Sequence, residues 1–211
     1  DVWTLFHSYA FDFSVWEIFG ALLFGGKLVI VPDQISKSPT DFYELIEKEK
    51  VTVLNQTPSA FKQLIRIDSE QITGDHLSLK YIIFGGEKLD FSILKPWIDK
   101  NHMKIKLVNM YGITETTVHV TFYEITKEDI LGKAKSIIGK PIDDLSLFIV
   151  NKDLQMLPVG VPGEILVSGK GVSKGYYGRP DLTKESFLEL PLSDERVYRT
   201  GDLGRYLPDG N

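Results

Sequence analysis

The chain has 211 residues, 43% of them hydrophobic, and a formal net charge of -5 at pH 7. This length and composition are enough to bury a core, in one large domain or two small ones. The negative net charge and the lack of a long basic run give no electrostatic reason to expect nucleic acid or an anionic membrane as partner. Because there is no cysteine, disulfides and thiolate zinc sites are excluded, which fits a cytoplasmic protein. The N-terminus lacks a basic targeting region, and we expect no membrane span.

The first part of the chain alternates predicted strands with predicted helices. KLVIVP, residues 27–32, predicts a buried strand, and the next polar stretch predicts a helix opened by Ser38, Pro39 and Thr40. The same step recurs with strands at 51–56, 79–86 and 105–112, the first two followed by helices at 58–67 and 90–101. This alternation predicts an α/β fold with a mostly parallel sheet and helices on both faces.

From about Ile137 the pattern changes to short strands between glycine and proline turns. LSLFIVN at 145–151 and GEILVSG at 163–169 are typical, and no helix of comparable length follows. We expect a small β-rich, barrel-like subdomain here, which divides the chain into residues 1–135 and 136–211. Because the chain lacks an initiator Met and ends in the turn YLPDGN, we also expect it to be a piece of a longer protein.

Three stretches follow predicted strands: NQTP, FGGEK and NMYGITET. In sheets of this class, ligands bind beyond the carboxyl ends of the strands. Gly85 and Gly86 would let a ligand approach the backbone closely, although a glycine pair after a strand also forms ordinary turns.

NMYGITET carries the most polar groups. The hydroxyls of Thr114, Thr116 and Thr117 can donate to phosphate oxygens. Glu115 is a hard oxygen ligand suited to Mg²⁺, and Tyr111 offers a flat face to a base. A capped turn with a solvated glutamate fits this stretch equally well.

Other ligand motifs do not match. SGKGVSKG resembles a Walker loop, but that pattern needs glycine at Glu164 and serine or threonine at Gly171. No G-x-G-x-x-G leads from a strand into a helix. The four histidines have no metal-like spacing; they are His7, His76, His102 and His119.

Two aspartates lie in unusual settings. Asp202, in YRTGDLG, lies in a predicted glycine-flanked turn, where it could accept hydrogen bonds from two ribose hydroxyls, although a turn aspartate usually has only a local role. Asp12, in FDFSVWEIFG, lies among aromatic residues. A carboxylate there is costly unless it is paired, so the ammonium group of a ligand is a candidate partner.

FDFSVWEIFG, NMYGITET, GEILVSGKGVSKGYYGRPDLTKESF and YRTGDL resemble, in this order, four successive motifs of nonribosomal peptide synthetase adenylation domains. These domains belong to the adenylate-forming enzymes, together with acyl-CoA ligases and luciferases. The resemblance spans the chain and implies an amino-acid-activating ligase. Such an enzyme forms aminoacyl-AMP and pyrophosphate from ATP and an amino acid, and passes the acyl group to the phosphopantetheine thiol of a carrier protein.

The resemblance also implies roles for single residues. Tyr111 would stack on adenine, with the Asn109 side chain and the Met110 backbone at its edge. The catalytic residues would be Thr114, at the α-phosphate, and Glu115, which would hold Mg²⁺. The remaining nucleotide-binding residues are Asp202, at the ribose hydroxyls, and Gly86. Ile113 stands where the family usually has proline, and the turn does not depend on it.

Nine positions of the family's amino-acid pocket resemble the set found in threonine-activating members. They are Asp12, Phe13, Trp16, Asn55, Ile83, Gly85, Met110, Val118 and His119. Asp12 would take the ammonium group. Asn55 and His119 are the polar groups available to a β-hydroxyl, and we favour His119 because either ring nitrogen can serve; packing against the sheet is its alternative role.

The implied layout assigns residues 1–135 to the amino-acid pocket and adenine site, and residues 136–211 to a subdomain truncated before a C-terminal domain. The family's phosphate loop and catalytic lysine would lie outside the chain, so we expect the isolated chain to be inactive. The implied partners are carrier-protein and condensation domains, with an MbtH-like protein as a candidate.

Two alternatives stay open. An acyl-CoA ligase or luciferase-like enzyme would share these motifs, but Asp12 argues against it, because a fatty or aryl acid has no ammonium group to pair. A non-catalytic scaffold module is the second alternative, since a fold alone does not define a function.

Overall fold

The computed structural model describes residues 1–70, 77–101, 104–132, 136–189 and 196–211, which form two compact units. Unit 1 comprises Asp1–Met110 and Tyr123–Ile137, and unit 2 comprises Tyr111–Phe122 and Ile138–Asn211. The chain thus leaves unit 1 at Tyr111 and returns to it at Tyr123. It enters unit 2 again at Ile138. The boundary expected between residues 135 and 136 adjoins the range 133–135, which lies outside the described residues.

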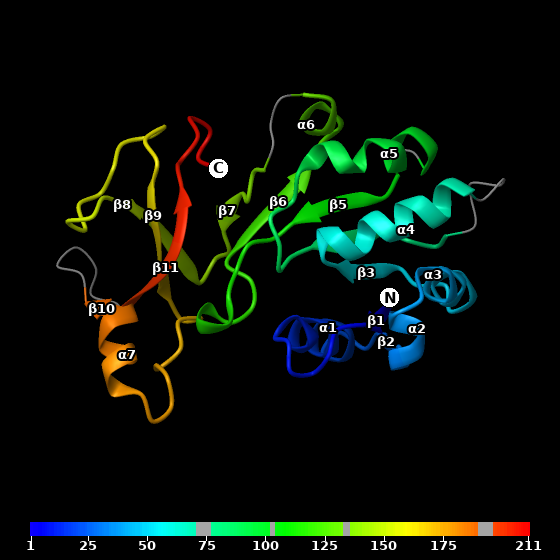
Figure 1. The fold of residues 1–211 in the computed structure, drawn as a ribbon, viewed down its shortest axis with the longest axis horizontal. Coiled ribbons are helices and arrows are strands. Elements are labelled where there is room, and N and C mark those ends of the chain that lie inside the picture. The colour runs from blue at the N-terminus through cyan, green and yellow to red at the C-terminus, as the bar shows by residue number, and fades with distance from the viewer. Residues whose placement is uncertain (71–76, 102–103, 133–135, 190–195) are drawn as a thin grey trace. The chain divides into compact units, whose positions relative to one another are not determined.

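Unit 1 is built on a sheet in the order β2-β1-β3-β4-β5-β6 (Figure 1). The strands are β1 (Val2–Leu5), β2 (Lys27–Ile30), β3 (Val53–Gln56), β4 (Tyr81–Phe84), β5 (Lys106–Asn109) and β6 (Thr121–Ile125). The pairs from β2 to β5 are parallel, and β6 runs antiparallel to β5 with Ile125 opposite Leu107. The predicted mostly parallel sheet is therefore confirmed.

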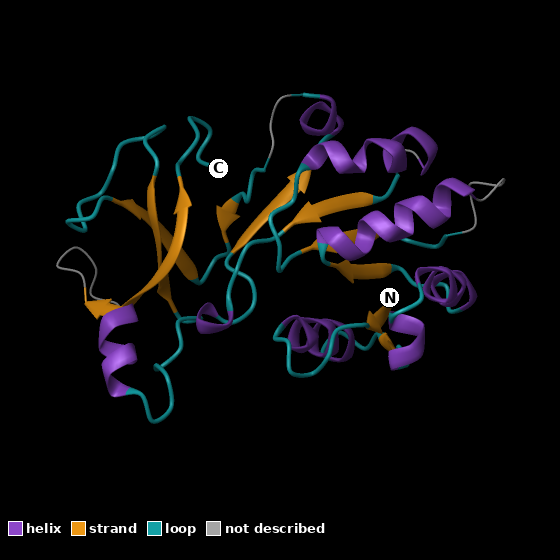
Figure 2. Ribbon diagram, viewed as in Figure 1, coloured by secondary structure: helices purple, strands orange, loops and turns teal. Residues whose placement is uncertain are grey.

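Seven helical segments precede, connect or follow these strands (Figure 2) in the described part of unit 1. They are α1 (Phe13–Leu22), α2 (Asp33–Ser36), α3 (Pro39–Lys48), α4 (Pro58–Glu70), the 3-10 segment η1 (Phe91–Leu94), α5 (Lys95–Asn101) and α6 (Lys127–Leu131). The start of α3 agrees with the prediction, because the Ser38 side chain accepts from Asp41 N and Pro39 follows it. The single helix predicted at 90–101 is a 3-10 turn followed by α5.

Both faces of this sheet are buried. Leu54, Ile82 and Leu107 point into the main core. There the ring of Phe61 in α4 contacts Trp97 in α5 with centroids 4.9 Å apart. Successive strand residues point to opposite faces, so the alternate residues face the other way.

The alternate residues Asn55, Ile83 and Val108 are also buried, and they stand opposite one another in the register of β3, β4 and β5. Trp16 donates from Nε1 to Asn55 Oδ1 at 2.9 Å, which places α1 on this second face. The prediction of helices on both faces is confirmed. None of the described helices is long and apolar enough to cross a membrane.

Unit 2 contains a four-stranded antiparallel sheet in the order β10-β11-β9-β8. Its elements are β7 (Lys140–Pro141), β8 (Leu145–Val150), β9 (Gly163–Gly169), α7 (Pro180–Ser186), β10 (Phe187–Glu189), β11 (Arg196–Gly204) and the 3-10 turn η2 (Thr114–Thr116). The core contains Leu147, Ile149 and Ile165 on one face of β8 and β9, with the Tyr111 ring packed against it. The predicted β-rich subdomain is this sheet.

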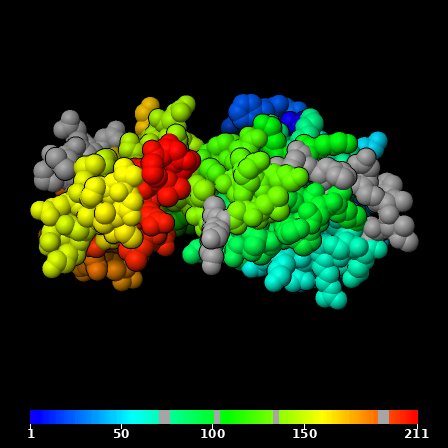
Figure 3. All heavy atoms as spheres, turned by 90° about the horizontal axis from the view of Figure 1, so that it is seen from above, coloured from blue at the N-terminus to red at the C-terminus, as the bar shows by residue number. Residues whose placement is uncertain are grey.

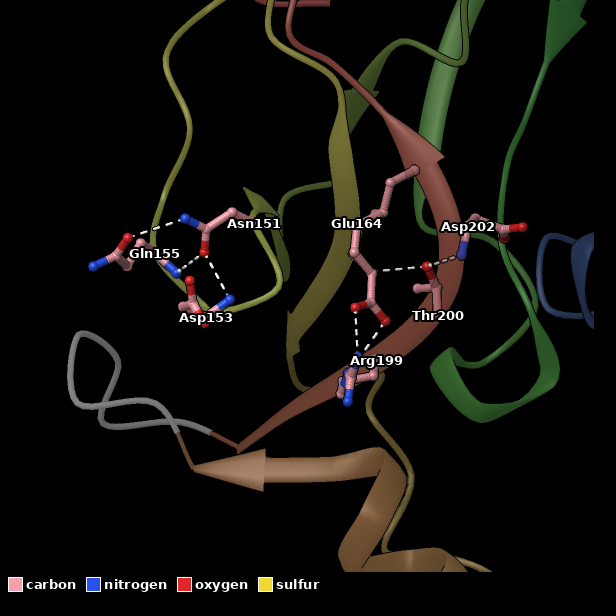
Figure 4. Close-up of polar contacts among 8 residues, drawn as sticks. Asn151, Asp153, Gln155, Glu164, Arg199, Thr200 and Asp202 are labelled. Atoms are coloured by element: carbon pink, nitrogen blue, oxygen red, sulfur yellow. Dashed lines mark hydrogen bonds and ion pairs between the residues drawn. The ribbon is translucent and has the colours of Figure 1, made fainter.

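The connection from β8 to β9 folds back on the end of the chain. Residues of this connection (yellow) lie beside the last residues (red) in Figure 3, and Gly160 N donates to Tyr206 O at 2.9 Å. Asn151 shapes the turn, since its Oδ1 accepts from Asp153 N at 2.9 Å and from Gln155 N at 3.0 Å (Figure 4). This is the local side-chain geometry that favours Asn in turns.

Candidate functional site

The loop after β5 is closed on itself by a hydrogen bond. Its backbone passes so close to residue 112 that only glycine fits there. Val120 N donates to Tyr111 O at 2.7 Å and closes the loop. A Cβ atom on Gly112 would lie 2.1 Å from Val118 O, so any side chain would push the two ends of the loop apart. Thr117 and Val118 both have left-handed φ angles, 64° and 70°, which cost of order 1–3 kcal/mol each for residues with a Cβ. Backbone strain of this kind is frequent at functional sites.

The three threonines of this loop have different environments. Thr116 is fully buried and donates to Ile113 O at 3.0 Å, so it holds the 3-10 turn together. Thr117 donates to Gly171 O at 2.6 Å. Thr114 is exposed at the start of the turn. The hydroxyls of Thr116 and Thr117 therefore each donate to a backbone carbonyl, and Thr114 is placed at the exposed start of the turn.

Glu115 is held by two tyrosines that the sequence did not single out. Tyr176 donates from its hydroxyl to Glu115 Oε1 at 2.6 Å, and the Tyr176 and Tyr198 hydroxyls lie 3.0 Å apart. The hydrogen bond to Glu115 raises the pKa of Tyr176. Burial, then the Tyr176 hydroxyl and the Glu115 carboxylate, raise the pKa of Tyr198. Both phenols therefore stay protonated donors, and they fix the orientation of the carboxylate.

The donor set around Glu115 suits a magnesium ion that also binds phosphate. Mg²⁺ in nucleotide sites is usually held by one or two carboxylates, with substrate phosphates and water completing the shell. A carboxylate has about four lone-pair positions, so Glu115 can accept more than the tyrosine bond. Within the described residues no group of three or more His, Asp or Glu side chains could hold a metal alone. His76 and His102 lie outside those residues.

Tyr111 and Asp202, 91 residues apart in the chain, meet in unit 2. The Tyr111 hydroxyl donates to Asp202 Oδ2 at 2.8 Å. Burial raises the pKa of Tyr111; the Thr200 hydroxyl lowers it and the Asp202 carboxylate raises it. Asp202 itself is exposed. An aromatic face and an exposed carboxylate, proposed separately for a base and a ribose, are thus neighbours.

The position of Asp202 differs from the predicted turn. Asp202 lies inside strand β11, where the pairing with β9 shifts between Arg199 and Leu203. Gly201 in this bulge has φ +74°, a conformation that glycine adopts without strain. Gly201, which predicted a turn, therefore lies in a β-bulge. Strand β11 stays paired with β9 on both sides of this bulge.

Asn109, Met110 and Gly86 belong to unit 1. Asn109 is buried and donates from Nδ2 to Ile137 O at 2.7 Å, which fixes its amide at the end of β5. Met110 N donates to Phe84 O at 2.9 Å and continues the pairing of β4 and β5. Gly86 has φ +77°, and a Cβ there would lie 3.0 Å from the Phe11 ring. Glycine is thus favoured at residue 86 both by the left-handed φ angle and by the close approach of the Phe11 ring.

Five of the residues proposed for the amino-acid pocket lie on the second face of the sheet in unit 1. Asn55, Ile83 and Gly85 follow the strand alternation to that face, and Met110 lies beyond Val108 on the same side. Trp16 of α1 reaches this face through its bond to Asn55. Five residues far apart in the chain therefore share one surface of unit 1.

The Trp16 bond fixes which end of the Asn55 amide is available. An indole N–H can only donate, so Asn55 Oδ1 must face it and Nδ2 must face away. Asn55 is fully buried, and its Nδ2 has no hydrogen-bond partner among the described residues. A buried donor without a partner costs about 1–3 kcal/mol, which a ligand oxygen can relieve.

Asp12 and Phe13 begin helix α1, and a buried pair missed by sequence reasoning lies beside them. Asp12 is the N-cap residue, and the Phe13 ring stacks on His7 with centroids 4.6 Å apart. His7 Nδ1 lies 3.0 Å from Glu17 Oε1, and Glu17 is fully buried. Burial raises the pKa of Glu17, while its hydrogen bonds to His7 and Phe6 N lower it. The one available signal was a glutamate inside an apolar helix.

Val118 and His119 belong to unit 2 and lie in the closed loop. His119 is 6% exposed, and this burial lowers its pKa to about 4. The imidazole is therefore neutral at pH 7, with one ring nitrogen as donor and the other as acceptor. A neutral imidazole is therefore better suited to bind a ligand hydroxyl than to bind a charged group of a ligand.

The chain matches the family model "AMP-binding enzyme" over residues 1–177. The chain belongs to the AMP-binding enzyme family. It is 52% identical, over its whole length, to a dimodular nonribosomal peptide synthase of Bacillus subtilis (strain 168), of which it covers 9%.

Many solved structures share the fold, among them the following two. The nonribosomal peptide synthetase FmoA3 (S1046A) superposes with a TM-score of 0.91 and 30% identity, over 100% of this chain and 22% of that one. The adenylation domain AlmE of Vibrio cholerae, solved with glycyl-adenosine-5'-phosphate, gives a TM-score of 0.86 and 27% identity, over 99% and 39%. The resemblance of this AMP-binding enzyme to nonribosomal peptide synthetase adenylation domains is thus confirmed, and it spans less than half of each relative.

Proposed function

We propose that this chain is the central part of an enzyme that activates an amino acid. A carboxylate oxygen of the amino acid attacks the α-phosphorus of ATP, the bond to the β-phosphate oxygen breaks, and aminoacyl-AMP and pyrophosphate form. The acyl group then passes to the phosphopantetheine thiol of a carrier protein, with release of AMP. The observation that carries the proposal is the contact between Tyr111 and Asp202 in the unit that also holds Glu115.

In this proposal Tyr111 stacks on adenine, Asp202 accepts from the ribose hydroxyls, and Thr114 donates to the α-phosphate. Asn109, Met110 and Gly86 line the adenine edge. Glu115 would hold Mg²⁺, and the ion would supply positive charge beside the phosphates. Catalysis then comes mostly from positioning and charge stabilisation by these groups.

The substrate we propose is L-threonine. Asp12 takes the ammonium group, and Phe13, Ile83, Met110 and Val118 leave room for a small side chain. Asn55 Nδ2, a buried donor turned away from Trp16, supports a ligand oxygen at this surface of unit 1. The neutral His119 is the second group that we propose for the hydroxyl.

We propose further that the full-length protein works in the cytosol with carrier-protein and condensation domains. The similarity to a dimodular nonribosomal peptide synthase supports this assignment. An MbtH-like protein is a further proposed partner. The phosphate loop and the catalytic lysine would come from residues outside this chain.

Pyrophosphate exchange by the full-length protein tests the proposed function. We expect exchange of labelled pyrophosphate into ATP that depends on an α-amino acid, because Asp12 offers a carboxylate to the ammonium group. Hexanoate and benzoate serve as carboxylic acids without an ammonium group. Exchange with these acids alone would favour the acyl-CoA ligase or luciferase-like alternative, and no exchange with any acid would favour the scaffold.

The isolated 211-residue chain should not form adenylate at a measurable rate. The groups proposed to hold the β- and γ-phosphates and to polarise the carboxylate lie outside it. We expect at most weak ATP binding through Tyr111 and Asp202. Adenylate formation by the purified chain above the buffer background, in a stopped assay with labelled ATP, would contradict this expectation.

A further inference from the structure

The side chain of Thr200 ties the bulge that carries Asp202 to the neighbouring strand. On β11, Arg199 pairs with Leu166 and Leu203 pairs with Glu164. Thr200, Gly201 and Asp202 therefore lie opposite Ile165 alone. The extra residues leave the ladder, so the Ile165 carbonyl faces a strand that has moved away from it.

Thr200 makes the two bonds that close this gap. Its Oγ1 donates to Ile165 O at 2.8 Å and accepts from Asp202 N at 3.0 Å (Figure 4). A hydroxyl has one hydrogen to donate and two lone pairs, so both bonds can form at once. The side chain thus satisfies a carbonyl on β9 and an amide on β11, and it couples the backbone of Asp202 to the neighbouring strand.

Two further interactions lie at the bulge. The bidentate pair of Arg199 and Glu164, with Nη2 to Oε2 at 2.7 Å, braces the bulge at its other end. In Figure 4 the Asp202 carboxylate is turned away from that pair. The Asp202 carboxylate accepts from the Tyr111 hydroxyl at 2.8 Å.

We propose that Thr200 is a positioning residue for ribose recognition, because its hydroxyl sets the angle at which the bulge presents Asp202 beside Tyr111. This inference rests on the proposed role of Asp202 as the acceptor for the ribose hydroxyls. Thr200 acts through the backbone of Asp202 and through the Tyr111–Asp202 contact, and it need not touch the nucleotide.

The test compares Thr200→Val, which keeps the shape and removes the hydroxyl, with Thr200→Ser, which keeps the hydroxyl. In pyrophosphate exchange by the full-length enzyme we expect Thr200→Val to raise the KM for ATP about threefold to tenfold, the scale of one hydrogen bond. The kcat should change little, and Thr200→Ser should restore the KM. With 2'-deoxy-ATP the effect of Thr200→Val should shrink, because one hydroxyl that Asp202 would bind is gone.

A matched control separates ribose positioning from general stability. Thr126 also uses its hydroxyl to accept from a backbone amide, Asp129 N at 3.2 Å, at the start of helix α6. Thr126→Val should lower the melting temperature about as much as Thr200→Val does. It should leave the KM for ATP unchanged. Equal increases in KM for both variants would overturn the inference.

Asp202→Asn distinguishes this inference from the proposed function. If Asp202→Asn leaves the KM for ATP unchanged, the ribose role fails and the inference fails with it. If Asp202→Asn raises the KM, Thr200→Val should add nothing further in that background. A full additional increase there, or a Thr200→Val effect confined to kcat, would overturn the inference and leave Asp202 in its role.

Discussion

Replacing Glu115 with glutamine should lower the rate of adenylate formation by the full-length enzyme by about 100- to 1000-fold, the range for losing one group that stabilises charge in a transition state. Glutamine has nearly the same shape and keeps an oxygen that Tyr176 can reach. It removes the negative charge that we propose for Mg²⁺. The loss should therefore appear as a weaker response to Mg²⁺ in pyrophosphate exchange, with the fold intact by circular dichroism.

Glu124→Gln is the control for this change. Glu124 is a surface residue of β6, and its carboxylate lies 3.2 Å from Lys106 Nζ. Exposed pairs of this kind contribute about 0–1 kcal/mol to stability, so the control should keep full activity. If Glu115→Gln kept the parent rate and the parent Mg²⁺ titration, Glu115 would have only a structural role with Tyr176.

The full-length enzyme should prefer threonine over valine by a factor that approaches about 10⁴, the lower end for a site built to bind a hydroxyl. Valine has the shape of threonine without the hydroxyl, so it would leave the buried Asn55 donor without a partner. Serine lacks only a methyl group and should lose about 10- to 200-fold. Competition of the three amino acids in pyrophosphate exchange measures both ratios.

Two variants identify the group that reads the hydroxyl. Asn55→Leu and His119→Leu each remove one candidate. The variant that largely loses the preference for threonine over valine in pyrophosphate exchange identifies the group that binds the hydroxyl. Gln56→Leu is the matched control, because Gln56 is an equally buried amide on the same strand with its side chain on the other face. Equal use of valine and threonine by the parent enzyme would refute a hydroxyl-reading pocket.

The sequence by itself determined the strands and helices that carry a clear period. β2 to β5 and α3 to α5 of unit 1 follow from apolar runs and amphipathic stretches bounded by caps and turns. Helix α1 gave no such signal, because it is apolar on all sides: Val15, Phe19 and Leu22 are exposed on it. Strand β1 was not predicted either, although at four residues it is as long as each of β2 to β5.

The sequence also determined which loops carry polar groups, and hence nearly every candidate residue of the site. Their chemistry depends on residue type alone: a carboxylate for metal or ribose, a ring for a base, a hydroxyl for phosphate. The order of four motifs then indicated the family that the match over residues 1–177 shows.

Only the tertiary structure decided which of these groups meet. The bond of Tyr111 to Asp202 spans 91 residues, and that of Trp16 to Asn55 spans 39. The first depends on the bulge in β11, and the second on the strand alternation that turns Asn55 to the second face of the sheet, where a shift of one residue would move the side chain to the opposite face. Periodicity within a short window contains no information on such pairings. The Glu115–Tyr176 bond, the free end of the Asn55 amide and the hold of Thr200 on Asp202 therefore became visible only in the fold.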